Sequence, residues 1–106
     1  MTVNYTLELS TTSPAVLDST VAFTAQLLVS PNNTVPDGEF HYLWLNSADH
    51  GLNHSVGNHQ AVLHRTFNGQ TVEAGEFLMT VIVSPRGRQR DILAFASTLF
   101  RLTGMN

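Results

Sequence analysis

Several stretches of the chain alternate large apolar side chains with other residues at a period of two. The clearest are residues 40–45, where Phe40, Tyr42 and Trp44 share one face, and residues 75–83. This period is the mark of a β-strand with one face buried in a core. Weaker alternation predicts an edge strand from Val3 to Ser10 and further strands over residues 21–29 and 61–67.

Clusters of turn-forming residues separate these strands. They predict a connection over residues 11–19 and loops over residues 31–38, 46–59 and 85–90. The inward positions of the predicted strands give a candidate core: Phe23, Tyr42, Trp44, Phe77, Val81 and Val83.

Residues 91–102 fit two patterns. Ile92, Phe95, Ala96, Leu99 and Phe100 have helical spacing, with Asp91 as a cap and Gly104 as a stop. Alternate positions, among them Ala94 and Leu102, equally fit one face of a strand. The turn before the segment and the β character of the rest favour the strand.

About seven strands with turns every 8 to 15 residues predict an all-β, immunoglobulin-like sandwich. A chain of 106 residues is long enough for one domain with a real core and too short for two, so residues 1–106 form a single predicted domain. Met1-Thr2-Val3 is no signal peptide. We therefore expect the domain to be excised from a larger protein if that protein is secreted or membrane-anchored.

Composition removes several function classes. There is no cysteine, and the net charge of −3 argues against a nucleic-acid partner. No apolar run approaches the ~18 residues needed to cross a bilayer, so we expect no membrane insertion by this segment. No complete catalytic motif occurs. We expect neither enzymatic activity nor a cofactor.

Three N-glycosylation sequons bear on the cellular compartment of the protein. They begin at Asn4, Asn32 and Asn53, the last two in predicted loops and the first in a predicted strand. Together with the low charged fraction of 12% they hint at an extracellular or luminal location, glycosylated or not.

Histidine is the main chemical candidate, because imidazole binds metals and titrates near physiological pH. His50, His54 and His59 lie in the predicted 46–59 loop, close to His64. Their spacing matches no metal motif, so solvated loop histidines are the favoured interpretation over a metal site or pH switch.

A second candidate is the basic cluster Arg86, Arg88 and Arg90 in the predicted hairpin turn. It could contact an acidic partner such as a sulfated glycan, although a solvated turn is the simpler interpretation.

The order of motifs resembles a polycystic-kidney-disease (PKD) domain over residues 7–84. The matching segments are Ser13-Pro14, Val21-Ala22-Phe23-Thr24-Ala25, Tyr42-Leu43-Trp44, His64-Arg65-Thr66-Phe67 and Gly75 to Val83. Where the family usually has Gly-Asp-Gly after an aromatic, this chain has residues 45–51 instead. It is thus similar to divergent members, such as the PKD domains in ectodomains of melanosomal-glycoprotein-like transmembrane proteins.

The resemblance implies a non-catalytic extracellular interaction or spacer module of a larger cell-surface glycoprotein. Such a module would bind protein or glycan through loops on a rigid scaffold. Weak self-association through an exposed edge strand is a further expectation. The alternatives are an accessory module of a secreted glycan-degrading enzyme and a metal- or pH-responsive domain built on the histidine loop.

Overall fold

The computed structural model describes residues 4–12 and 15–104, and these form an all-β sandwich. Val3 of the predicted first strand and Ser13-Pro14 of the PKD-like pattern lie outside the described residues. The strands are β1 (Tyr5–Thr11), β2 (Ala15–Val16), β3 (Thr20–Val29), β4 (Phe40–Asn46), β5 (Leu52–Gly57), β6 (Gln60–Thr66), β7 (Gly75–Pro85) and β8 (Ala94–Thr103).

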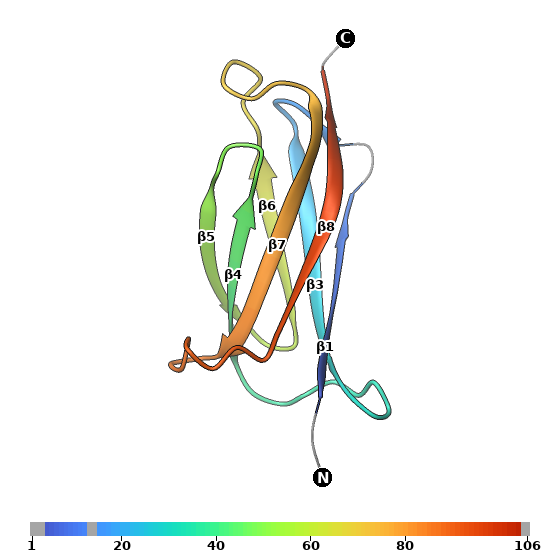
Figure 1. Ribbon diagram of the computed structural model, residues 1–106, viewed down its shortest axis with the longest axis vertical. Coiled ribbons are helices and arrows are strands. Elements are labelled where there is room, and N and C mark those ends of the chain that lie inside the picture. The colour runs from blue at the N-terminus through green and yellow to red at the C-terminus, as the bar shows by residue number, and fades with distance from the viewer. Residues whose placement is uncertain (1–3, 13–14, 105–106) are drawn as a thin grey trace.

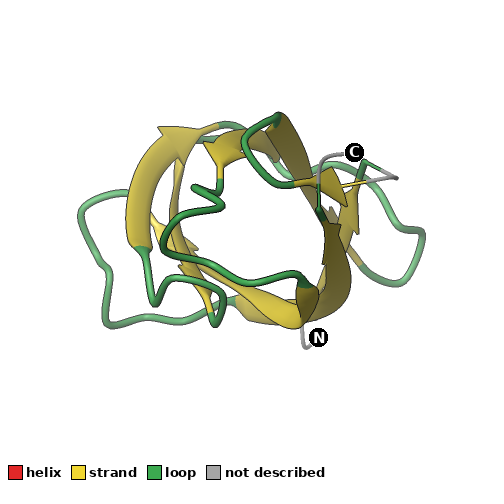
Figure 2. Ribbon diagram, turned by 90° about the horizontal axis from the view of Figure 1, so that it is seen from above, coloured by secondary structure: helices red, strands yellow, loops and turns green. Residues whose placement is uncertain are grey.

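The strands make two sheets that curve around a common interior (Figures 1 and 2). One sheet has the order β1-β3-β6 and the other the order β2-β8-β7-β4-β5. All pairs are antiparallel except the short β2, which runs parallel to β8. Among the described residues there is no helix able to cross a membrane.

The core lies between the inward faces of both sheets. Five of the six predicted core residues are buried, namely Phe23, Tyr42, Trp44, Val81 and Val83, while Phe77 packs partly buried against them. Their alternation with less buried neighbours along each strand confirms the period-two prediction.

Phe100 on β8 joins the two sheets in this core. Its ring meets Phe23 of the opposite sheet edge-on, with centroids 5.1 Å apart, and stacks on Phe67 at 5.5 Å. Phe77 lies 6.0 Å away on the neighbouring strand. Such aromatic pairs add to the free energy gained from burying their area.

The strand interpretation is confirmed from Ala94 onward, and the helical alternative is wrong. In β8, Ala94, Ala96, Phe100 and Leu102 take the inward positions, while Phe95 and Leu99 point outward. Ile92 precedes the strand and is exposed. A helix would have left β7 without its antiparallel partner at this sheet edge.

The prediction of a continuous loop over residues 46–59 is wrong, because β5 lies inside it. This strand inverts the usual pattern: Leu52 and Val56 point to solvent, and Asn53 and Ser55 point inward. The inward polar side chains of β5 bond residues of other strands, Ser55 to Trp44 and Asn53 to Arg65. Trp44 Nε1 donates a hydrogen bond to Ser55 Oγ at 3.0 Å.

A smaller correction concerns the predicted connection over residues 11–19, which contains β2. Ala15 and Val16 pair with Leu102 and Thr103, so β2 covers the outer edge of β8. Leu17 continues this contact by donating its backbone N–H to the Thr103 carbonyl.

Phe100 and Phe95 offer a matched pair on one strand, since the first is 4% exposed and the second 72%. We expect Phe100→Ala to lower the free energy of unfolding by about 3–5 kcal/mol, because it empties a site between the sheets. Phe95→Ala should change it by no more than about 0.5 kcal/mol. Urea unfolding followed by Trp44 fluorescence measures both, and similar losses would contradict this packing.

Candidate interaction surface

The outer surface of the five-stranded sheet is rich in apolar side chains. Between the core residues of β4 and β7 stand Leu43, Leu45, Leu78 and Ile82, and all four point away from the interior. The flanking strands β5 and β8 add two each. We call the eight together the outer apolar face: Leu43, Leu45, Leu52, Val56, Leu78, Ile82, Phe95 and Leu99.

Strand register makes this face continuous. Leu78 lies opposite Leu99 and Ile82 opposite Phe95, while Leu43 pairs with Ile82 on the other side of β7. Directly opposed side chains on one face have Cβ atoms roughly 5 Å apart. Phe95 and Leu99 are 72% and 65% exposed, so β8 presents two large apolar side chains to solvent.

Charge on this sheet surface lies at its two ends. Glu39 and Arg86 form an ion pair where β4 begins and β7 ends. At the other end, Glu76 and Arg101 are opposite each other in the β7–β8 register, beyond Leu78 and Leu99. Between the apolar residues, Thr80 and Ser97 satisfy each other through a hydrogen bond of 2.8 Å. A surface of this kind can exclude water from a second apolar surface without desolvating an unpaired charge.

Sequence reasoning missed this face, although a signal was present. In a two-layer sandwich only one face of each sheet meets the core, and the other is ordinarily polar. Residues 40–45 and 75–83 carry apolar side chains on both faces. The outward apolar residues are themselves a sign of an exposed apolar face, but the alternation alone predicts only strands and a core.

A histidine pair lies beside the apolar residues. His41 on β4 and His54 on β5 place Nε2 and Nδ1 at 2.9 Å from each other, with ring centroids 5.1 Å apart. Burial, with the nearby His54 as a second cause, lowers the pKa of His41 below its usual value. His54 is exposed, yet it sits on a strand and not in the loop predicted for it.

The other histidines are separate from this pair. His50 takes a left-handed backbone conformation in the β4–β5 turn, with φ of 57°. His59 precedes β6, and His64 lies exposed on that strand. Within the described part of the chain, no three His, Cys, Asp or Glu side chains come together as a metal cluster. The grouping of His50, His54 and His59 therefore has no support there.

A polar network holds the β4–β5 turn against β6. Arg65 forms an ion pair with Asp49, donates a hydrogen bond to Asn53 Oδ1 at 3.0 Å and lies over the Phe67 ring. Asn46 Oδ1 accepts the backbone N–H groups of residues 48 and 49. Burial raises the pKa of Asp49, but the Asn46 hydrogen bond and the Arg65 charge outweigh it and lower the pKa overall.

The arginine cluster lies in the turn between β7 and β8, as predicted, and all three side chains are exposed. Arg86 forms an ion pair with Glu39, and Arg88 lies 3.5 Å from Asp91. These neighbouring carboxylates offset part of the positive charge that an acidic partner would need.

The sequons fall at different places. Asn4 precedes β1, and its carbonyl accepts the Ser30 N–H at 2.9 Å, so Asn4 and Asn32 share one end of the sandwich. Both are exposed. Asn53 lies on β5, half-buried and bonded to Arg65, so the expectation that it occupies a loop is wrong. None of the three stands on the outer apolar face.

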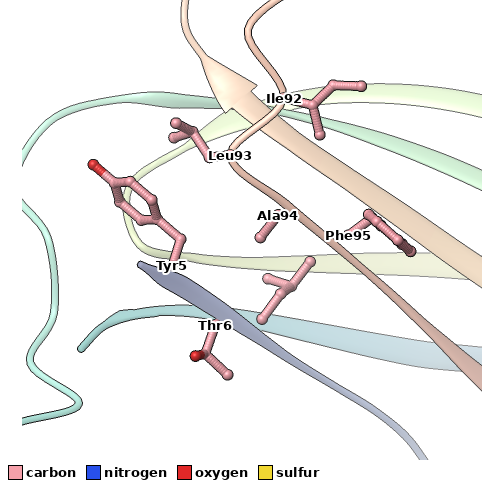
Figure 3. Close-up of a pocket in the computed structure, with 7 residues that line it drawn as sticks. Tyr5, Thr6, Ile92, Leu93, Ala94 and Phe95 are labelled. Carbon is pink, nitrogen blue, oxygen red and sulfur yellow. The ribbon is translucent and has the colours of Figure 1, made fainter. Parts of the chain in front are cut away.

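A shallow depression of about 440 Å³ opens between the start of β1 and the entry to β8 (Figure 3). Tyr5 and Thr6 line it from β1, and Ile92, Leu93 and Phe95 from the other side. The lining side chains include no acid, base or nucleophile beyond the two hydroxyls. Its chemistry suits contact with an apolar group.

The Asp49–Arg65 pair gives one prediction for stability. We expect Asp49→Ala to lower the free energy of unfolding by about 1–3 kcal/mol, since it leaves the largely covered Arg65 guanidinium without its carboxylate. Asp91→Ala, which removes the partner of exposed Arg88, should cost less than about 0.5 kcal/mol. Equal losses in chemical denaturation would contradict a special role for the turn network.

The histidine pair gives a second prediction. Because the pKa of His41 is lower in the folded protein, its stabilising effect is present above the unfolded value of 6.5 and is lost as pH falls through the folded value. The unfolding free energy should thus decline below pH about 6.5, and His41→Asn should remove this decline, whereas His54→Asn takes away only the smaller cause and should flatten it in part. His59→Asn serves as the control; an unchanged profile in His41→Asn would refute this assignment.

Comparisons of the chain with protein-family models, curated proteins and solved structures find no match.

Proposed function

We propose that this domain is a non-catalytic interaction module of a larger extracellular or luminal glycoprotein, built as a PKD-type, immunoglobulin-like sandwich. The partner is a protein, and the binding surface is the outer apolar face. This moves the expected contact from the loops to the surface of a sheet. Support for the family comes from the order of motifs, including Tyr42-Leu43-Trp44 and residues 75–83.

One observation carries the proposal of a binding surface. Eight apolar side chains lie at outward positions of four adjacent strands, with Thr80, Ser97 and His54 among them, and Phe95 and Leu99 are more than 60% exposed. Continuous apolar patches of this kind mark interaction sites on soluble domains, whereas scattered single apolar residues need no explanation. An aromatic residue in such a patch is typical of interface centres.

The polar features of the chain agree with this choice. Asn4 and Asn32, the two exposed sequon residues, lie at one end of the sandwich and not on the outer apolar face. A glycan ligand would need hydrogen-bonding groups, and the face offers few of these beyond Thr80 and Ser97, which already bond to each other. A protein surface is therefore the better complement.

Site-specific photo-crosslinking tests the proposal. The protein would be expressed on cells with p-benzoylphenylalanine at position 95 of the face or at position 88 of the arginine turn. We expect position 95 to crosslink to a single protein species, which is either a different protein or a second copy of this chain. Leu99→Ser should abolish that product, and Val62→Ser, at an exposed apolar residue of the other sheet, should not.

Crosslinking from position 88 alone would return the binding surface to the loops and overturn the proposal. The absence of any defined product at position 95 would overturn it as well.

A further inference from the structure

The two histidines of the outer surface are placed by the sheet itself. His41 lies opposite Val56, and Leu43 lies opposite His54, so the imidazoles are diagonal neighbours across β4 and β5. On its other side His41 faces Ser84 of β7. Just beyond His41 and Ser84 in the β4–β7 register lie Glu39 and Arg86, which form an ion pair with each other.

The distance between the facing imidazole nitrogens matches the distance between two nitrogen ligands of one metal ion. A first-row metal ion binds imidazole at about 2.0–2.1 Å, so two ligands at 90° stand about 2.9 Å apart and two at a tetrahedral angle about 3.4 Å apart. The observed separation between His41 Nε2 and His54 Nδ1 is 2.9 Å. Little movement of the strands would be needed to bring one ion within reach of both rings.

From this geometry we propose that His41 and His54 form a site for one divalent transition-metal ion, bound through Nε2 of His41 and Nδ1 of His54. Water completes the coordination on the solvent side, where His54 is exposed. Two imidazoles favour Cu²⁺ over Ni²⁺ and Zn²⁺ and offer nothing to Mg²⁺ or Ca²⁺. The ion fixes β5 to β4.

Binding converts the hydrogen bond into two metal–nitrogen bonds. In the neutral pair one of the facing nitrogens carries a proton and the other accepts it. The metal takes the lone pairs of both nitrogens, and the displaced proton is replaced by one at the second nitrogen of the same ring. No net proton is released from the neutral pair. Each ring rotates about its Cβ–Cγ bond, so that the two facing nitrogens point toward the ion and no longer toward each other.

The two histidines differ in how the fold holds them. His41, only 7% exposed, is held in place by its neighbours on β4, β5 and β7. His54 is the solvent-facing ligand.

Titration of the untagged, N-terminally acetylated protein with Cu²⁺ tests this site. Calorimetry in a non-coordinating buffer at pH 7.4 should show one-to-one binding, weaker with Zn²⁺ and absent with Mg²⁺. Electron paramagnetic resonance of the Cu²⁺ complex should show nitrogen ligands, and amide signals near positions 41 and 54 should broaden first.

The His54→Asn variant should lose this binding, and His59→Asn and His64→Asn should keep it. His54 is exposed, so its replacement leaves the core intact; the circular dichroism spectrum checks that the variant is folded. Absence of one-to-one Cu²⁺ binding, or equal binding by folded His54→Asn, would overturn the proposal. Neither result depends on the crosslinking experiment.

Discussion

The polar atoms of two buried aromatic side chains constrain the rest of this sandwich. Trp44 and Tyr42 are almost fully buried on the inner face of β4, and each carries a group that must be hydrogen-bonded. Ser55 accepts the Trp44 N–H, and the Asn58 carbonyl accepts the Tyr42 hydroxyl at 2.6 Å. Both partners come from β5 and its following turn. Burial raises the pKa of Tyr42 to about 12, so its hydroxyl remains a donor.

The need of Trp44 and Tyr42 for hydrogen-bond partners determines which residues of the edge strand β5 face inward. Because the inward positions of β5 serve polar partners, its apolar residues Leu52 and Val56 face outward. They extend the surface already formed by Leu43 and Leu45 on β4. His54 takes the position between them and meets His41. The β5 part of the outer apolar face and the position of His54 are therefore both consequences of how the edge strand satisfies the core.

The Asp49–Arg65 network has the complementary role at the end of the same hairpin. It joins the β4–β5 turn of one sheet to β6 of the other, where Arg65 also covers the Phe67 ring. The network fixes this end of the β4–β5 hairpin, and the register of that hairpin brings the two imidazoles together. The loops expected to bind are thus largely structural at this end, and the sheet surface is left as the place for contact.

The sequence by itself determined the β class, the strands with an inward apolar face, and most of the core, including Trp44 and Phe23. Period-two alternation is a local signal that can be recognised in the sequence without knowing which strands lie side by side. It did not reveal β5, whose inward residues are polar because they bond Trp44 on β4 and Arg65 on β6. Nor did it pair His41 with His54, since a diagonal contact depends on strand register. Only tertiary structure decided these, because hydrogen-bond partners and cross-strand neighbours are set by which strands lie side by side.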